Sequence, residues 1–240
     1  YVRAITIRSG STVSYADAHA TESGRTYIYK ITAYKTVDGT TYASDYSATK
    51  TKCYLAQSTI TGLTNTADGI TVKWSKVAGA DGYKIYRRIE SGNWTLIKNI
   101  TSGSRITWSN TNRISGTRYQ YRVAAYKTVG GTTYIGTYSA AKTIFYLAQP
   151  VITGLSKTGS GVMVKWSKVA GADGYRIYRS GDGGASYVRA ITIRSGSTVS
   201  YADAHATKKG KTYIYKIRAF KSENGTAYYS TYSKTRSITR

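Results

Sequence analysis

The chain has 240 residues, 40% of them hydrophobic, and carries a formal net charge of +24. A single cysteine excludes a disulfide within the chain, and the sequence has no apolar run of about eighteen residues that would span a bilayer as a helix. The positive charge favours contact with polyanions without identifying one. The aromatic residues include 25 Tyr but only 2 Phe, which favours strands because tyrosine packs well on a pleated, half-buried surface.

The sequence is built from a repeated unit. Residues 1–21 recur without a change at 187–207, and the segment at 72–87 returns at 164–179 with one Lys replaced by Arg. Repetition at a fixed period indicates tandem copies of one structural unit. The repeats predict three parts, which are the back part of a unit with its first strands missing (1–55) and two complete units (56–147 and 148–240).

Apolar and polar residues alternate along each unit. Ile70, Val72 and Trp74 alternate with polar residues, and the same pattern follows at 83–86 and 119–125. A period of two is typical of strands with one buried face and one wet face. Short turn sequences rich in Gly, Asn, Asp and Ser separate these runs. The pattern predicts an all-β fold of antiparallel β-sandwiches.

The inward positions of this pattern predict the core of each sandwich. Aromatic side chains bury a large area, and truncating an inward Trp to Ala typically costs about 3–5 kcal/mol. The predicted core residues are Trp74, Trp166, Tyr83, Tyr175, Tyr119, Tyr121, Tyr213, Tyr215, Tyr27 and Tyr29.

The part at 1–55 has an inward face with no opposing sheet in its own unit. A half sandwich cannot cover such a surface by itself. We expect the missing strands to come from residues outside this sequence or from a neighbouring chain.

The outward positions of the third and sixth strands form the predicted binding face. Cations interleaved with aromatic rings can hold an anionic polymer through charge and through stacking. The alternative is a solubilising face that only protects the sheet from pairing with other sheets. The candidate residues are Lys84, Tyr86, Arg88, Arg122 and Trp94 in the first complete unit, and Arg176, Tyr178, Lys216 and Arg218 in the second.

The remaining chemistry-bearing residues predict no catalytic or metal site and no cofactor. His19 and His205 occupy equivalent loop positions without further convergent ligands, and Cys53 stands alone at a unit junction. No nucleophile–base–acid set and no nucleic-acid-binding motif is present. The sequence therefore predicts a chain that is not an enzyme and recognises no specific nucleic acid.

These residues resemble fibronectin type III domains over the whole chain. The resemblance is carried by Trp74 and Trp166, by the Y-x-I-Y run at 83–86 and 175–178, and by Y-x-Y-x-[VI]-x-A motifs at 27–33, 119–125 and 213–219, each followed by a Tyr-Ser pair. It implies a fibronectin type III or immunoglobulin-like sandwich. It also implies tyrosine-corner residues at Tyr27, Tyr119 and Tyr213, whose hydroxyls bond to backbone near the preceding loop.

The sequence GADGYKIYR at 79–87 is most similar to tandem copies in large surface or secreted proteins of Gram-positive bacteria. That resemblance implies an extracellular spacer or stalk that also binds anionic cell-wall polymers or glycans with low affinity. One alternative is an adhesin that binds a host surface glycoprotein or an antibody. Another is an accessory carbohydrate-binding region of a larger secreted enzyme.

Overall fold

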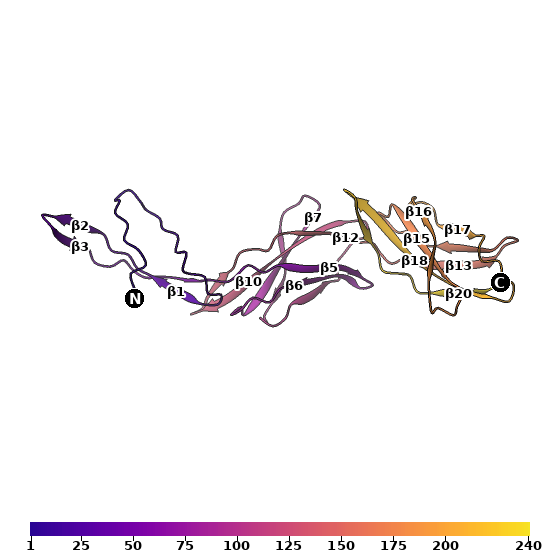
Figure 1. The fold of residues 1–240 in the computed structure, drawn as a ribbon, viewed down its shortest axis with the longest axis horizontal. Helices are drawn as coiled ribbons and strands as arrows, with labels where there is room; N and C mark the ends of the chain where they lie inside the picture. Colours follow the sequence, from indigo (N-terminus) through magenta and orange to yellow (C-terminus); the bar gives the residue numbers. More distant parts are fainter.

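The computed structural model describes residues 1–240 as an elongated row of β-structure (Figure 1). Its regular elements are β-strands joined by turns, and every strand pairing is antiparallel. The predicted all-β fold class is confirmed, and the two complete units are antiparallel sandwiches arranged in tandem. The structure contains no helix long and apolar enough to cross a membrane.

The middle domain, made of β5 to β12, is a sandwich of two sheets. One sheet has the order β5-β6-β9, and the other has the order β11-β10-β7-β8 with β12 also paired to β10. Strands β11 and β12 therefore share one edge of the long strand β10. The strands are β5 (Ile60–Thr66), β6 (Gly69–Trp74), β7 (Gly82–Ile89), β8 (Thr95–Ile100), β9 (Thr107–Asn110), β10 (Arg118–Val129), β11 (Thr132–Ile135) and β12 (Lys142–Phe145).

The C-terminal domain, made of β13 to β20, repeats this topology. Its sheets have the orders β13-β14-β17 and β16-β15-β18-β19, with β20 also paired to β18. The strands are β13 (Ile152–Lys157), β14 (Val162–Trp166), β15 (Gly174–Ser180), β16 (Val188–Ile193), β17 (Ser200–Asp203), β18 (Thr212–Glu223), β19 (Thr226–Tyr229) and β20 (Arg236–Thr239).

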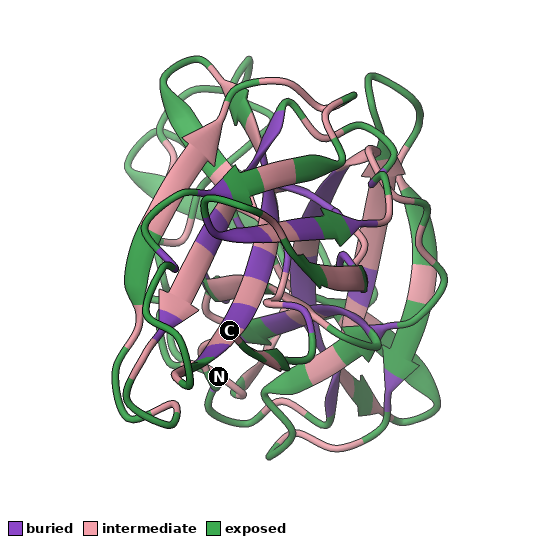
Figure 2. Ribbon diagram, turned by 90° about the vertical axis from the view of Figure 1, so that its right-hand side faces the viewer, coloured by how far each residue is buried: buried purple, intermediate pink, exposed green.

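Each complete sandwich is closed by an aromatic core. Trp74 packs against Tyr83 with ring centroids 5.4 Å apart, and Trp166 packs against Tyr175 at 5.3 Å. Tyr119, Tyr121, Tyr213 and Tyr215 are buried with them. Viewed along the long axis, buried stretches of strand lie inside the molecule and exposed residues dominate the surrounding loops (Figure 2).

Tyrosine suits this core because its hydroxyl reaches backbone groups that would otherwise lack partners. The Tyr83 hydroxyl accepts a hydrogen bond from the Val77 backbone N–H at 2.9 Å. At the tyrosine corner, the Tyr119 hydroxyl accepts from the Ile114 N–H at 2.8 Å. Equivalent corner bonds link Tyr213 to the Lys208 N–H at 3.1 Å and Tyr27 to the Glu22 N–H at 3.2 Å.

The N-terminal segment, residues 1–55, has strands but no closed sandwich. Its strands are β1 (Thr26–Tyr29), β2 (Tyr34–Val37), β3 (Thr40–Ala43) and β4 (Lys50–Cys53), paired as β1-β4 and β2-β3. Tyr27 and Tyr29, predicted as core residues, are only half-buried because no second sheet covers them. Only Cys53 and Leu55 of the segment are buried, and both pack into the core of the middle domain.

Candidate functional site

The predicted binding residues of the middle domain lie together on the outer face of its larger sheet. The register of β7 and β10 places Tyr86 directly opposite Arg122 and Lys84 opposite Ala124. On the same strand, the alternate residues Tyr83 and Ile85 point into the core and are fully buried. The outward side chains are half-buried rather than fully exposed, because aromatic rings cover the cations.

Arg122 is held between aromatic rings. Its guanidinium carbon lies 3.9 Å from the Tyr138 ring centroid and 4.5 Å from that of Trp94. Tyr86 meets Tyr138 edge to face, with centroids 5.1 Å apart. Arg88 lies 4.9 Å from the same Trp94 ring. A cation over a ring face is attracted by the quadrupole of the ring, so the rings fix where these charges sit.

The C-terminal domain carries an equivalent face with a different arrangement of cations. Tyr178 stands opposite Lys216, and Arg176 stands opposite Arg218. The Lys216 ammonium lies 3.8 Å from the Tyr187 ring centroid and 4.6 Å from that of Tyr232. We call this surface, in both domains, the cation–aromatic face.

One arrangement, a sixth-strand cation held between two aromatic rings, recurs in all three parts of the chain, and we call it the clamp. In the N-terminal segment, the Lys30 ammonium lies 4.4 Å from the Tyr1 ring and 3.7 Å from the Tyr46 ring. Lys30 occupies the position of Arg122 and Lys216 in the repeat. The clamp therefore forms wherever the sixth-strand cation and its two flanking rings are present, even without a closed sandwich.

Sequence reasoning named Trp94 as a binding residue but not Tyr138, Tyr187 or Tyr232. The repeated Tyr-Ser pair was the available signal for Tyr138 and Tyr232. Behind Tyr138, the Ser139 hydroxyl accepts from the Val123 N–H at 3.0 Å, and the Ser139 N–H donates to the Val123 carbonyl at 2.8 Å. These two bonds fix the chain beside β10 and hold Tyr138 over Arg122. Ser233 makes the same two bonds with Ile217 below Tyr232.

The glutamine at the start of each complete unit also supports the clamp. The Gln57 side-chain amide donates to the Tyr138 carbonyl at 2.6 Å, and the Gln149 amide donates to the Tyr232 carbonyl. The position of the clamp is therefore tied to the segment that joins one unit to the next.

The cations of the face have no acidic partners. The ion pairs of the structure involve His19, Arg25, Arg118, Arg179 and Lys221. None of the six predicted cations of the face is among them. The face therefore presents uncompensated positive charge in a geometry fixed by rings.

The pKa values of the equivalent phenols Tyr86 and Tyr178 shift in opposite directions. Burial, and then the neighbouring Tyr138, raise the pKa of Tyr86 to about 12, against the lowering effect of Arg122. Burial also raises the pKa of Tyr178, but Tyr232, Arg218 and Arg176 together outweigh burial and lower it. The largest lowering contribution at Tyr178 is its hydrogen bond with Tyr232, ahead of the charge of Arg218.

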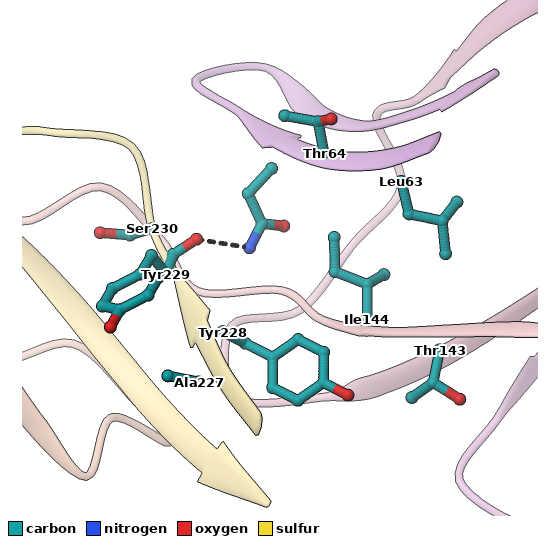
Figure 3. Close-up of a pocket in the computed structure, with 9 residues that line it drawn as sticks. Leu63, Thr64, Thr143, Ile144, Ala227, Tyr228, Tyr229 and Ser230 are labelled. Carbon is teal, nitrogen blue, oxygen red and sulfur yellow. Dashed lines mark hydrogen bonds between the residues drawn. The ribbon is translucent and has the colours of Figure 1, made fainter. Parts of the chain in front are cut away.

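A groove of about 350 Å³ separates the middle and C-terminal domains. Figure 3 shows Leu63, Thr64, Thr143 and Ile144 on one side, and Ala227, Tyr228, Tyr229 and Ser230 on the other. The side-chain amide of Asn65 crosses it and donates to the carbonyls of Phe145 at 2.8 Å and Tyr229 at 2.9 Å. The amide thus links the two domains.

Comparison with known proteins finds matches among solved structures alone. No protein-family model matches the sequence, and no curated protein matches it. Among solved structures, the chain is similar to the FN1–FN3 domains of chicken CNTN1, with 19% identity and a TM-score of 0.35. That alignment covers 88% of this chain and 75% of the other.

Proposed function

We propose that the chain is a non-catalytic extracellular spacer whose cation–aromatic faces bind anionic cell-wall polymers or glycans with low affinity. The spacer role is supported by a joint that recurs between consecutive parts of the chain. Interfaces between domains of one chain are often mobile. A stalk therefore keeps the two ends of the chain at a set distance and angle only if its joints fix the relative orientation of the domains.

The joint brings two glycines into direct contact. Gly116, with φ +84°, precedes the sixth strand of the middle domain and meets Gly171 of the C-terminal domain. A Cβ at Gly116 would lie 2.8 Å from the Gly171 Cα. Gly24 and Gly79 form the same contact between the N-terminal segment and the middle domain, with a corresponding distance of 2.6 Å. Any side chain at these positions would push the two parts of the chain apart.

A serine next to each glycine locks the joint. The Ser115 hydroxyl donates to the Ala170 carbonyl at 2.9 Å and accepts from the Ala148 N–H at 3.0 Å. Ser23 makes the same pair of bonds at 2.8 and 3.1 Å, with the Ala78 carbonyl and the Ala56 N–H. One hydroxyl thus connects the preceding domain, the linker and the following domain.

The joint between the two complete domains has a second set of contacts. Phe145 packs against Tyr228 with centroids 5.2 Å apart, and Arg118 pairs with Glu223 at 3.3 Å. The Asn65 amide adds its two bonds in the same region. A joint held at several separate contacts resists bending more than a joint held at one point.

Residual dipolar couplings of the two complete domains test the spacer role. We expect both domains of the native chain to share one alignment tensor, because the joint fixes their relative orientation. Gly116→Ala should give two different tensors while the core couplings of each domain stay unchanged. Gly154→Ala is the matched control, since a Cβ at Gly154 meets no atom within 4 Å. Independent tensors in the native chain would contradict the spacer role.

A salt titration tests the binding role. We expect the chain to bind an anionic cell-wall polymer at low ionic strength and to release it by about 0.5 M salt, because the Debye length is then only a few ångströms. A neutral glycan of similar length is the control. Binding that persists in high salt would point to a shaped site rather than to screened charge.

A further inference from the structure

We infer that Arg176 and Arg218 of the C-terminal domain form a site for a tetrahedral oxyanion, namely a phosphate or sulfate group carried by an anionic polymer. The inference deepens the binding half of the proposed function and rests on it for the polymer. It assigns recognition to one pair of guanidinium groups rather than to the charge of the whole face.

The pair is a like-charge cross-strand pair. The register of β15 and β18 places Arg176 directly opposite Arg218. Residues directly opposite in a sheet have Cβ atoms only about 4.5–5.5 Å apart, and like charges at that separation destabilise the sheet. No carboxylate pairs with either residue to relieve the repulsion. An anion between the two guanidinium groups would relieve it.

Aromatic contacts hold the two guanidinium groups in place. The Tyr229 ring centroid lies 4.0 Å from the Arg218 guanidinium carbon and 4.7 Å from that of Arg176. An Nη of Arg218 also donates to the Tyr178 hydroxyl at 3.2 Å. The Nε atoms of both arginines are buried without a hydrogen-bond partner. A guanidinium held in this way loses little additional freedom when it binds an anion.

The chemistry of the pair favours an oxyanion over a neutral sugar. Guanidinium groups bind phosphate and carboxylate through two parallel N–H···O bonds, and two such groups can share one tetrahedral anion. The Tyr229 ring, in contrast, already packs against two cations and is less available to stack on a sugar.

The middle domain provides a natural control on the same backbone. Its residues at the corresponding positions are Lys84 and Ala124, which are also directly opposite in the register of β7 and β10. This domain therefore has a cation–aromatic face but lacks the pair. A comparison of the two domains separates the pair from the general charge of the face.

The test follows the side-chain Nε–H resonances of the arginines by NMR in the full chain, at constant ionic strength. Inorganic phosphate and inorganic sulfate are the small probes. Polyphosphate, heparin and neutral dextran then distinguish a phosphate polymer, a sulfated glycan and an uncharged glycan. We expect saturable shifts at Arg176 and Arg218 with the anions and none with dextran. Shifts of equal size at Arg122 would overturn the proposal.

Two double variants complete the test. R176K/R218A places the middle-domain side chains in the C-terminal domain, and we expect its affinity for polyphosphate to fall at least about tenfold. K84R/A124R does the reverse and should create a second saturable site. Near-native unfolding midpoints in both variants would show that the folds are kept. Unchanged affinity of R176K/R218A for polyphosphate would overturn the assignment of the site to Arg176 and Arg218.

The outcomes also separate this inference from the proposed function. If R176K/R218A still binds polymer in low salt like the native chain, the assignment of the site to Arg176 and Arg218 is wrong, and binding driven by overall charge is supported. If the native chain binds inorganic phosphate at Arg176 and Arg218 but binds no polymer, the oxyanion site is supported and the proposed binding of polymers is wrong.

Discussion

Residues 1–21 and 187–207 have the same sequence but different structures. In the C-terminal domain, this sequence contributes strand β16, paired with β15, and strand β17, paired with β14. In the N-terminal segment, the identical residues 1–21 form no strand. The first 55 residues contain no counterparts of β14 and β15, so the backbone groups of residues 1–21 have no sheet to join.

Local contacts survive in both copies. The Tyr29 hydroxyl donates to the Asp17 carboxylate at 2.9 Å, as the Tyr215 hydroxyl does to Asp203. The same carboxylates accept from the N–H groups of His19 and His205 at 3.0 and 3.1 Å. The hydrogen bonds around Asp17 and Asp203 therefore form in both copies, whereas strand formation requires a partner strand from elsewhere in the chain.

The largest expected effect comes from giving the first copy its missing partners. A fusion of residues 148–186 to the front of residues 1–55 should fold into a complete sandwich. Amides within residues 2–7 and 14–17 should then exchange more than about a thousandfold more slowly, which corresponds to a global stability above about 4 kcal/mol. Hydrogen exchange measures this, with residues 188–193 of the native chain as reference. Fast exchange in the fusion would show that residues 1–55 cannot complete a domain.

The buried ion pair of the complete copy gives the next largest effect. Asp203 is fully buried and accepts two bonds from Arg179, at 2.7 and 2.8 Å. Arg179→Met leaves this carboxylate without its cation and should destabilise the C-terminal domain by about 3–5 kcal/mol. Chemical denaturation measures the loss.

The middle domain supplies the control for the ion pair. There, Asn110 replaces the aspartate, and Arg87 donates only to the Asn112 carbonyl at 2.8 Å. Arg87→Met should therefore cost much less than Arg179→Met. Adding Asp203→Asn to Arg179→Met should restore part of the lost stability. Equal costs for the two arginine variants would contradict this role for Asp203.

Buried phenols of the closed sandwiches provide a smaller, pH-dependent effect. Burial raises the pKa of Tyr121 from 10.0 to about 12, partly offset by the bond from Asn110. Folding therefore favours the neutral phenol, and its contribution is complete below pH 10 and is lost as the pH rises towards 12. The unfolding free energy of the middle domain should fall by ~1.4 kcal/mol per pH unit over this range. Denaturation at a series of pH values measures the slope, which Tyr121→Phe should reduce.

The smallest expected effect is at the histidines. The His205 side chain is exposed at the surface, and the bond to Asp203 comes from its backbone N–H. His205→Ala should change stability by less than about 0.5 kcal/mol, because surface substitutions away from special features rarely do more. His19→Ala should have an equally small effect on the N-terminal segment. A loss above 1.5 kcal/mol at His205, roughly three times this limit, would reveal a side-chain role that the structure does not show.

Much of the fold and part of the site could be predicted from the sequence. Alternation at 70–74 and 83–86 is enough to assign inward and outward residues, because successive side chains of a strand point to opposite faces. The same rule places Tyr86 and Arg122 on one outer face. It cannot identify Tyr138 as the ring over Arg122, since that ring reaches the sheet from outside the strands.

By itself, the sequence determined the repeat, the strand pattern and the aromatic cores of the two complete units. The tertiary structure decided which of two identical segments becomes sheet, which rings hold each cation, and that Arg176 faces Arg218. The physical reason is that periodicity and local hydrogen bonds are encoded within a few residues. Pairing between distant strands, ring clamps and joints, in contrast, depend on partners far along the chain, such as Tyr138 for Arg122 and Gly171 for Gly116, whose position only the folded chain fixes.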